Sequence, residues 1–412
     1  MSGEKIYEGV FAVHKPQGIT SAEVIRNLQT HFNPSDTFKP WLETEQIRRK
    51  RESDRQRKRR RTQRLDVKIG HGGTLDPLAT GVLVTGIGKG TKHLNDFLGC
   101  TKSYETVVLF GAETDTYDRL GKVVRRGPYE HITRDAVEKA LEKFRGKIMQ
   151  RPPIFSALKV KGKPLYEYAR EGKVPPVEIK ERPVEVKDLR IVEWYEPGTH
   201  EYQWPEEEAA GEEKAVAEKL LEKDDELPIA TSAEGAEKSD VQDASATKRK
   251  TPPPQSPEAT TAPKEEGTAD VQGDSAPTAK KQKVSEGDSV PVQSEESSGA
   301  PQEAEKSTIS EDKDAAPKAQ PAAVKIVMTV TSGFYVRSLA HDLGKAVGSC
   351  ALMSSLIRTR QAHFELDSDK VLEYKDLEAG EEVWGPKVQR FLDEWEKKRE
   401  AEESSDPINA SP

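Results

Sequence analysis

The chain has 412 residues, of which 34% are hydrophobic, 33% charged and 6% aromatic, and its formal net charge is −8. This composition is too polar for a protein that is packed throughout, so part of the chain is expected to be disordered. The two cysteines are far apart in the sequence, which favours a reducing compartment and argues against a structural zinc site or a disulfide framework. No apolar run is long enough to span a membrane.

The first predicted element is a strand over the apolar residues 9–13, followed by the turn His-Lys-Pro-Gln-Gly at 14–18. Thr20 and Glu23 then have the spacing of a capping box, and apolar residues recur at helical spacing up to residue 32. A helix is therefore predicted to follow the turn.

The segment 33–66 is a basic insert. Between residues 46 and 64 it carries eleven Lys or Arg residues and only two acidic ones. A block with so much charge of one sign repels itself and is not expected to fold alone. It predicts a nuclear-import signal, a nucleic-acid arm, or both.

The stretch 69–81 reads Ile-Gly-His-Gly-Gly-Thr-Leu-Asp-Pro-Leu-Ala-Thr-Gly. Pro77 disfavours the helical conformation at Asp76, and the glycines allow the backbone to lie close to a ligand. A carboxylate on such a turn suits attack on a bulky, flat substrate. Taken alone, however, the composition favours an ordinary glycine-rich loop around a solvated aspartate.

The remaining folded elements follow from hydrophobic periodicity. Strands are predicted over 81–84, 102–111, 184–194, 324–330 and 355–360, and helices over 133–146, 165–170, 336–347 and in the C-terminal segment. The glycines at 86–90 lack the spacing of a nucleotide-binding loop, so no ATP or NAD site is predicted there.

The segment 205–322 differs from the rest of the chain. It contains no aromatic residue and carries 28 acidic and 14 basic residues, whereas the remainder of the chain has a net charge of +6. It has too little apolar surface to offset the entropy of ordering it. We therefore predict a disordered acidic insert within a basic folded part.

Several motifs together resemble the TruB family of tRNA pseudouridine synthases. The stretch 70–81 is similar to the family's catalytic motif, and the other matches, in chain order, are 14–18, 102–104, 155–163, 165–170 and 333–338. The resemblance implies an α/β (α+β) catalytic domain on a mixed, mainly antiparallel sheet flanked by helices. This domain would comprise 1–204 and 323–376, interrupted by the inserts 33–66 and 205–322 and followed by a C-terminal helix and disordered tail at 377–412.

The resemblance also implies roles for individual residues. Asp76 matches the essential aspartate, which acts as a nucleophile at ribose C1′ or as a base at C2′. Tyr104 matches a tyrosine that stacks on the uracil, and Arg337 matches an arginine that pairs with the aspartate and keeps it ionised. The substrate-binding residues implied are Lys15, His71, Gly73, Thr74, Tyr335, Lys159 and Tyr168. No metal or cofactor is implied.

The implied function is a stand-alone, monomeric enzyme that isomerises uridine-55 in the T arm of tRNA, with action on mRNA left open. The basic arm 46–64 would contact the phosphate backbone. Two alternatives are an RNA-folding factor on the same scaffold and a guide-RNA-dependent synthase subunit. Three basic clusters, 57–61, 248–250 and 280–283, favour the nucleus and contact with the import machinery; a mitochondrial or cytoplasmic pool stays open.

Overall fold

The computed structural model describes residues 4–59, 63–171, 173, 175–177, 179–211, 214–215, 217–218 and 320–405. Most of the predicted acidic insert lies outside these residues, as do the basic clusters at 248–250 and 280–283 and the predicted C-terminal tail beyond 405. The described residues belong to a single unit.

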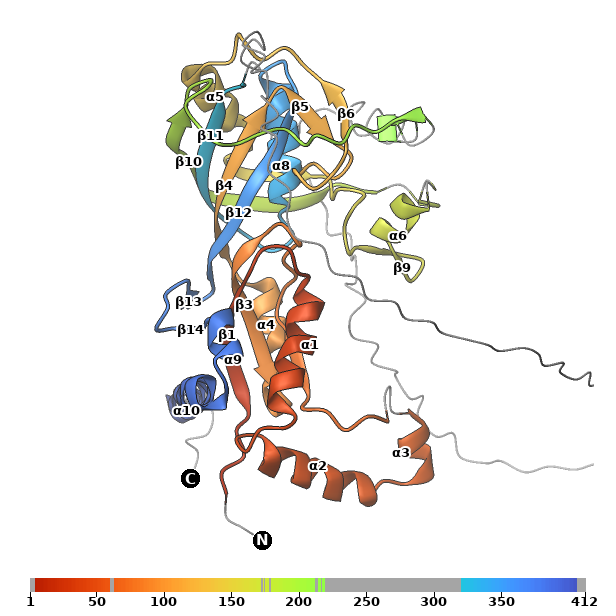
Figure 1. Cartoon of the computed structure of the whole chain (residues 1–412), viewed down its shortest axis with the longest axis vertical. Helices are drawn as coiled ribbons and strands as arrows, with labels where there is room; N and C mark the ends of the chain where they lie inside the picture. The colour runs from red at the N-terminus through yellow and green to blue at the C-terminus, as the bar shows by residue number, and fades with distance from the viewer. Residues whose placement is uncertain are drawn as a thin grey trace, which may run out of the picture. The chain divides into compact units, whose positions relative to one another are not determined.

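The secondary structure of this unit is shown in Figure 1. The strands are β1 (Gly9–Lys15), β2 (Ile69–His71), β3 (Thr80–Ile87), β4 (Lys102–Phe110), β5 (Ala112–Thr114), β6 (Val123–Arg126), β7 (Gly146–Gln150), β8 (Lys159–Val160), β9 (Lys163–Pro164), β10 (Arg182–Tyr195), β11 (Ala323–Val330), β12 (Ala351–Gln361), β13 (Phe364–Glu365) and β14 (Val371–Leu372). The helices are α1 (Ser21–Phe32), α2 (Lys39–Lys50), α3 (Asp54–Arg59), α4 (Leu94–Gly99), α5 (Arg134–Leu141), α6 (Leu165–Arg170), α8 (Val336–Ala346), α9 (Tyr374–Glu378) and α10 (Glu381–Ser405), with short 3₁₀ turns η1 (Gly88–Lys92) and η2 (Glu142–Phe144).

One large sheet organises the described residues. Its strand order is β14-β1-β3-β12-β4-β11-β10-β7, with β2 paired to β3 and β13 paired to β12. The pairs β1–β14 and β3–β12 are parallel, and the other pairs in this sheet are antiparallel. The predicted mixed, mainly antiparallel sheet flanked by helices is therefore confirmed.

The larger core forms where α5 and α8 lie against the middle of the sheet. Alternate residues of β11, from Val324 to Val330, point into this core, as the alternating pattern predicts. The apolar face of α8, including Leu339 and Leu343, packs on β12 and β4 and belongs to the same core. This packing holds the first residues of α8 near the loop between β2 and β3.

A second core lies around β1 and contains the C-terminal helix. Trp384 of α10 is 1% exposed, and its ring lies 4.7 Å from that of Phe32 in α1. Phe391 of α10 stacks on Phe11 of β1. The predicted division at residue 376 therefore does not mark a boundary in the core, because α10 completes the packing of the N-terminal strand and helix. No helix among the described residues is long and apolar enough to cross a bilayer.

The predicted inserts are ordered at their edges. Val123 of β6 donates a hydrogen bond to Glu207 O and accepts one from Ala209 N, both at 2.9 Å, so the folded part continues past residue 204. In the basic insert, α2 is held by Trp41, whose Nε1 donates to Glu8 Oε1 at 2.9 Å, whereas α3 buries no residue. The basic block is thus partly helical, and its helix α2 depends on docking to the core.

Candidate active site

An ion pair between Asp76 and Arg337 forms the centre of the candidate site. Asp76 lies in the loop between β2 and β3, and Arg337 is the second residue of α8. Arg337 Nε donates to Asp76 Oδ2 at 2.8 Å; the arginine side chain is 5% exposed and the aspartate side chain 36%. Within the described residues, Asp76 Oδ1 accepts no hydrogen bond, so this oxygen is available to a ligand.

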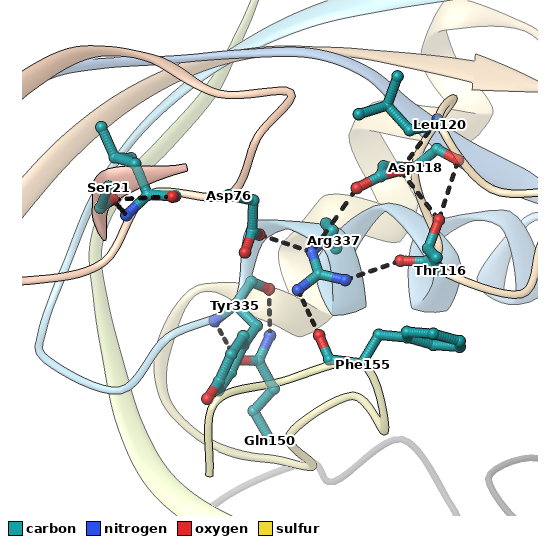
Figure 2. Close-up of polar contacts among 10 residues, drawn as sticks. Ser21, Asp76, Thr116, Asp118, Leu120, Gln150, Phe155, Tyr335 and Arg337 are labelled. Carbon is teal, nitrogen blue, oxygen red and sulfur yellow. Dashed lines mark hydrogen bonds and ion pairs between the residues drawn. The ribbon is translucent and has the colours of Figure 1, made fainter. Parts of the chain in front are cut away.

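The guanidinium of Arg337 also holds two other segments of the chain (Figure 2). Its Nη1 donates to Thr116 O and its Nη2 to Phe155 O, both at 2.9 Å. The carboxylate of Asp118 lies 4.0 Å from Nε, and burial raises the pKa of this carboxyl, an effect that Arg337 opposes. Because three segments accept from one planar group, the cation beside Asp76 has a fixed orientation.

The backbone next to Asp76 is held by the segment that precedes and begins α1. Ser21 Oγ accepts from Leu75 N at 2.8 Å and donates to Leu75 O at 2.9 Å. Gly18 N donates to Pro77 O at 2.8 Å. The N-terminal turn thus fixes the residues on both sides of the aspartate.

Lys15 lies against the backbone of this loop, near enough to Asp76 for the two charges to interact. It is 0% exposed, and its Nζ donates to Ala79 O at 2.6 Å and to Pro16 O at 2.9 Å. Burial lowers the pKa of this amine to about 8. The structure therefore places Lys15 as a support of the loop backbone, and its place among the substrate-binding residues stays a prediction.

Tyr104 lies on β4 and packs with the apolar residues that flank Asp76. It belongs to the same buried cluster as Leu75 and Leu78. Its hydroxyl makes no hydrogen bond within the described residues. The Tyr104 ring is therefore positioned by apolar packing and not by its hydroxyl, which suits a role as a stacking surface.

The predicted residues His71, Gly73 and Thr74 lie where β2 leads into the Asp76 loop. Burial lowers the pKa of His71. Gly73 has φ +141, and its carbonyl lies 3.4 Å from Nη2 of the buried Arg358, whereas Thr74 is exposed. The region is close to the aspartate in the chain, but within the described residues no hydrogen bond joins these side chains to it.

The other three predicted residues lie in three different places. Tyr335 precedes α8, and the side chain of Gln150 holds it through bonds to its backbone N and O at 2.8 and 3.0 Å (Figure 2). Lys159 is exposed on the β8–β9 hairpin. Tyr168 of α6 donates to Val160 O at 3.2 Å, which fastens the hairpin to this helix. The hairpin follows the loop that contains Phe155, whose carbonyl accepts from Arg337.

Several residues of this arrangement were not among the predicted site residues. They are Ser21, Thr116, Asp118, Gln150 and Phe155. Thr116 and Asp118 belong to a polar stretch shortly after the predicted strand 102–111, and this position was a usable signal. Thr116 and Phe155 act through backbone carbonyls, which no side-chain pattern reveals. Among the described residues, no group of three His, Cys, Asp or Glu side chains is placed to hold a metal ion.

Comparisons with known proteins agree with the motif resemblance. Residues 58–206 match the model of the TruB family pseudouridylate synthase (N terminal domain). The chain is 38% identical over 378 residues to tRNA pseudouridine synthase 4 of Schizosaccharomyces pombe, covering 90% of this chain and 83% of that protein. It is 34% identical over 396 residues to tRNA pseudouridine synthase 4 of Saccharomyces cerevisiae, covering 94% and 85%. Pseudouridylate synthase TRUB1 of Mus musculus is 43% identical over 190 residues, which cover 46% and 51% of the two chains.

Proposed function

Because the chain belongs to the TruB family of pseudouridylate synthases, we propose that it is a stand-alone enzyme that isomerises uridine-55 in the T arm of tRNA. Its relatives of similar length are named tRNA pseudouridine synthases, which supports tRNA as the substrate class. The observation that carries the proposal is the Asp76–Arg337 ion pair, in which a partly exposed carboxylate keeps one oxygen free beside a buried, fixed cation.

The proposed reaction is an isomerisation that needs no oxidant or reductant. The bond from ribose C1′ to N1 of the uracil breaks, the base rotates, and C1′ joins C5. The proton lost from C5 and the proton gained at N1 balance. The target base must first leave its stack in the folded loop, which costs roughly a few kcal/mol.

In this proposal Asp76 acts on the ribose, either as a nucleophile at C1′ or as a base at C2′. Both roles need an exposed carboxylate oxygen held in one place, and the support for this is the unbonded Oδ1 together with the Ser21 clamp on Leu75. Arg337 orients the carboxylate through Oδ2. Tyr104 would stack on the uracil and assist the late proton transfer from C5.

The substrate-binding residues are also proposals. His71, Gly73 and Thr74 would lie beside the flipped nucleotide. Tyr335, directly before α8, would also contact the substrate. Lys159 and Tyr168, on the β8–β9 hairpin and α6, would contact the RNA outside the pocket. The basic arm 46–64 would contact the tRNA phosphate backbone. Hairpins in mRNA that reproduce the T loop would also be substrates, because they would present the same kind of uridine to the Asp76 site.

The deciding experiment uses the full chain and a T-arm transcript without any guide RNA. The wild-type protein should form pseudouridine, and Asp76→Asn should form none while still binding the transcript. Pseudouridine formation without guide RNA contradicts the guide-dependent alternative. An RNA-folding factor predicts instead that tRNA folding is promoted equally by both proteins and that neither forms product.

We propose a nuclear location from the three basic clusters. A mitochondrial or cytoplasmic pool of the protein is a second proposal. Microscopy of the tagged full chain, with and without substitution of the cluster at 57–61, tests the nuclear location. Unchanged nuclear accumulation of the substituted chain would remove that cluster from the proposal.

A further inference from the structure

The two helices of the basic arm differ in how their positive charges are used. In α2, Arg48 forms two hydrogen bonds to Glu45, both at 2.7 Å, and Arg49 Nε donates to Glu45 Oε1 at 2.8 Å. The hydrogen bond from Arg48 lowers the pKa of Glu45. Arg48 also lies 3.7 Å from Glu52, so two carboxylates face these two arginines within the arm, through pairs at i,i+3 and i,i+4 spacing.

Arg49 has a second structural role at the base of the arm. Its Nη1 donates to Arg64 O at 2.9 Å, so it joins α2 to the segment that returns to the core. Because its Nε is bound to Glu45 and its Nη1 to the returning backbone, Arg49 is largely occupied within the arm. The arginines of α2 thus hold the arm together.

Helix α3 presents its charges differently. Arg55, Arg57, Lys58 and Arg59 are all exposed, and no acidic side chain among the described residues forms an ion pair with them. Arg55, Lys58 and Arg59 have i, i+3 and i+4 spacing and so share one helix face. Gln63 Nε2 donates to Arg57 O at 3.2 Å, which ties the end of this short helix to the returning chain.

Helix α3 projects from the unit. In Figure 1 it extends on the same side of the view as β9 and α6. Strand β9 belongs to the hairpin that follows the Phe155 loop, and α6 comes directly after it. A cationic helix whose exposed basic side chains form no ion pair with a described acidic residue is suited to a polyanion that extends beyond the Asp76 site.

We propose that α3, and not α2, is the part of the arm that contacts RNA phosphates, through the face formed by Arg55, Lys58 and Arg59. Helix α2 and Arg49 are the scaffold that holds this face away from the core. The inference rests on the proposed function for its ligand, an RNA whose target uridine enters the Asp76 site. By composition alone the basic residues of α2 and α3 are equivalent, whereas their contacts in the structure differ.

The test compares three variants of the full chain. The first is Arg55→Gln with Lys58→Gln and Arg59→Gln. The matched control is Lys139→Gln with Lys143→Gln and Lys147→Gln, three exposed lysines on or just after α5, which Figure 1 shows at the other end of the unit. It makes the same change in net charge. The third variant, Arg48→Gln, removes a charge from α2 within the arm.

The measurement is the dissociation constant for a tRNA transcript across a salt series. Each lost phosphate contact should reduce the slope of log affinity against log salt by about 0.9, so the α3 variant should lose roughly 2 to 3 and bind about tenfold or more weakly at low salt. The α5 control and Arg48→Gln should keep slopes close to that of the wild-type protein.

Three results would overturn the inference. One is an equal loss of slope in the α5 control, which would mean that net charge alone matters. Another is a loss of about 0.9 in Arg48→Gln, the full value for one phosphate contact, which would make the two helices equivalent residue for residue. The third is an unchanged slope in the α3 variant together with lost nuclear accumulation, which would assign α3 to an import receptor. Absence of pseudouridine formation by the wild-type chain would instead reject the proposed function, because the salt slopes are measured without catalysis.

Discussion

The hydroxyl of Ser21 makes two hydrogen bonds to one residue, Leu75, accepting its N–H at 2.8 Å and donating to its carbonyl at 2.9 Å. Leu75 is the neighbour of Asp76, and Ser21 is 2% exposed. A single buried side chain thus satisfies both backbone groups of the residue that precedes the proposed catalytic aspartate. This relationship connects the start of α1 to the geometry of the site.

We predict that Ser21→Ala lowers both stability and turnover. The buried N–H of Leu75 would lose its partner, which costs about 1–3 kcal/mol, and the loop that carries Asp76 would loosen. Chemical denaturation and the kcat and KM for a T-arm transcript measure the two effects. Ser35→Ala is the matched control, because Ser35 is also buried and its Oγ donates to Phe32 O at 2.8 Å, away from the site. Equal kcat values for the two variants would refute a positioning role for Ser21.

Arg337→Lys should reduce turnover by about 100-fold although the positive charge is kept. A lysine has one point of attachment and cannot hold Asp76, Thr116 O and Phe155 O in the planar arrangement that the guanidinium provides. Misplacement of a catalytic group by about 1 Å is sufficient for a loss of this size. Single-turnover kinetics at saturating RNA measure it. Arg145→Lys, a partly exposed arginine bound to Leu189 O, is the control and should retain activity.

Lys15 should make stability rise with pH between about 8 and 10.5. Burial lowers the pKa of its amine in the folded chain to about 8 from an ordinary value of 10.5. Between these values the unfolded chain binds more protons than the folded chain, so the free energy of unfolding increases as pH rises, by up to about 3 kcal/mol. Below pH 8 this contribution is constant.

The variant Lys15→Met tests this pH dependence. The difference in unfolding free energy between pH 8 and pH 10 should be smaller in Lys15→Met than in the wild-type chain. Lys39→Met, which changes an exposed lysine, should keep the wild-type difference. Equal pH dependence in Lys15→Met and the wild-type chain would show that Lys15 does not titrate in this range.

Gly81→Ala should destabilise the protein more than Gly18→Ala. Both glycines have positive φ, +104 and +91, so both substitutions incur backbone strain of about 1–3 kcal/mol. At Gly81 an added Cβ would also lie 2.3 Å from Arg358 O, whereas at Gly18 it would meet no atom within 4 Å. Thermal unfolding compares the two. Similar losses would mean that strain alone, and not close approach of β12, requires the glycine at 81.

Much of the fold could be predicted because it depends on local periodicity. The alternation from Val324 to Val330 predicted β11, and the apolar spacing after Val336 predicted α8. The motif around Asp76 and its resemblance to a known family also predicted Arg337 as its partner, although 261 residues separate them. The packing of α10 against Phe11 and Phe32 could not be predicted in this way, because a helical pattern shows which face is apolar but not which surface covers it.

The sequence by itself determined the family, the long central strands of the sheet and the candidate catalytic aspartate. Only the tertiary structure decided that Ser21 clamps Leu75, that Lys15 supports the loop backbone, and that Arg49 joins α2 to the carbonyl of Arg64. The physical reason is that these outcomes depend on which groups meet in space. Every residue carries a carbonyl like those that Thr116 and Phe155 offer to Arg337, so no side-chain pattern indicates which of them an arginine will contact.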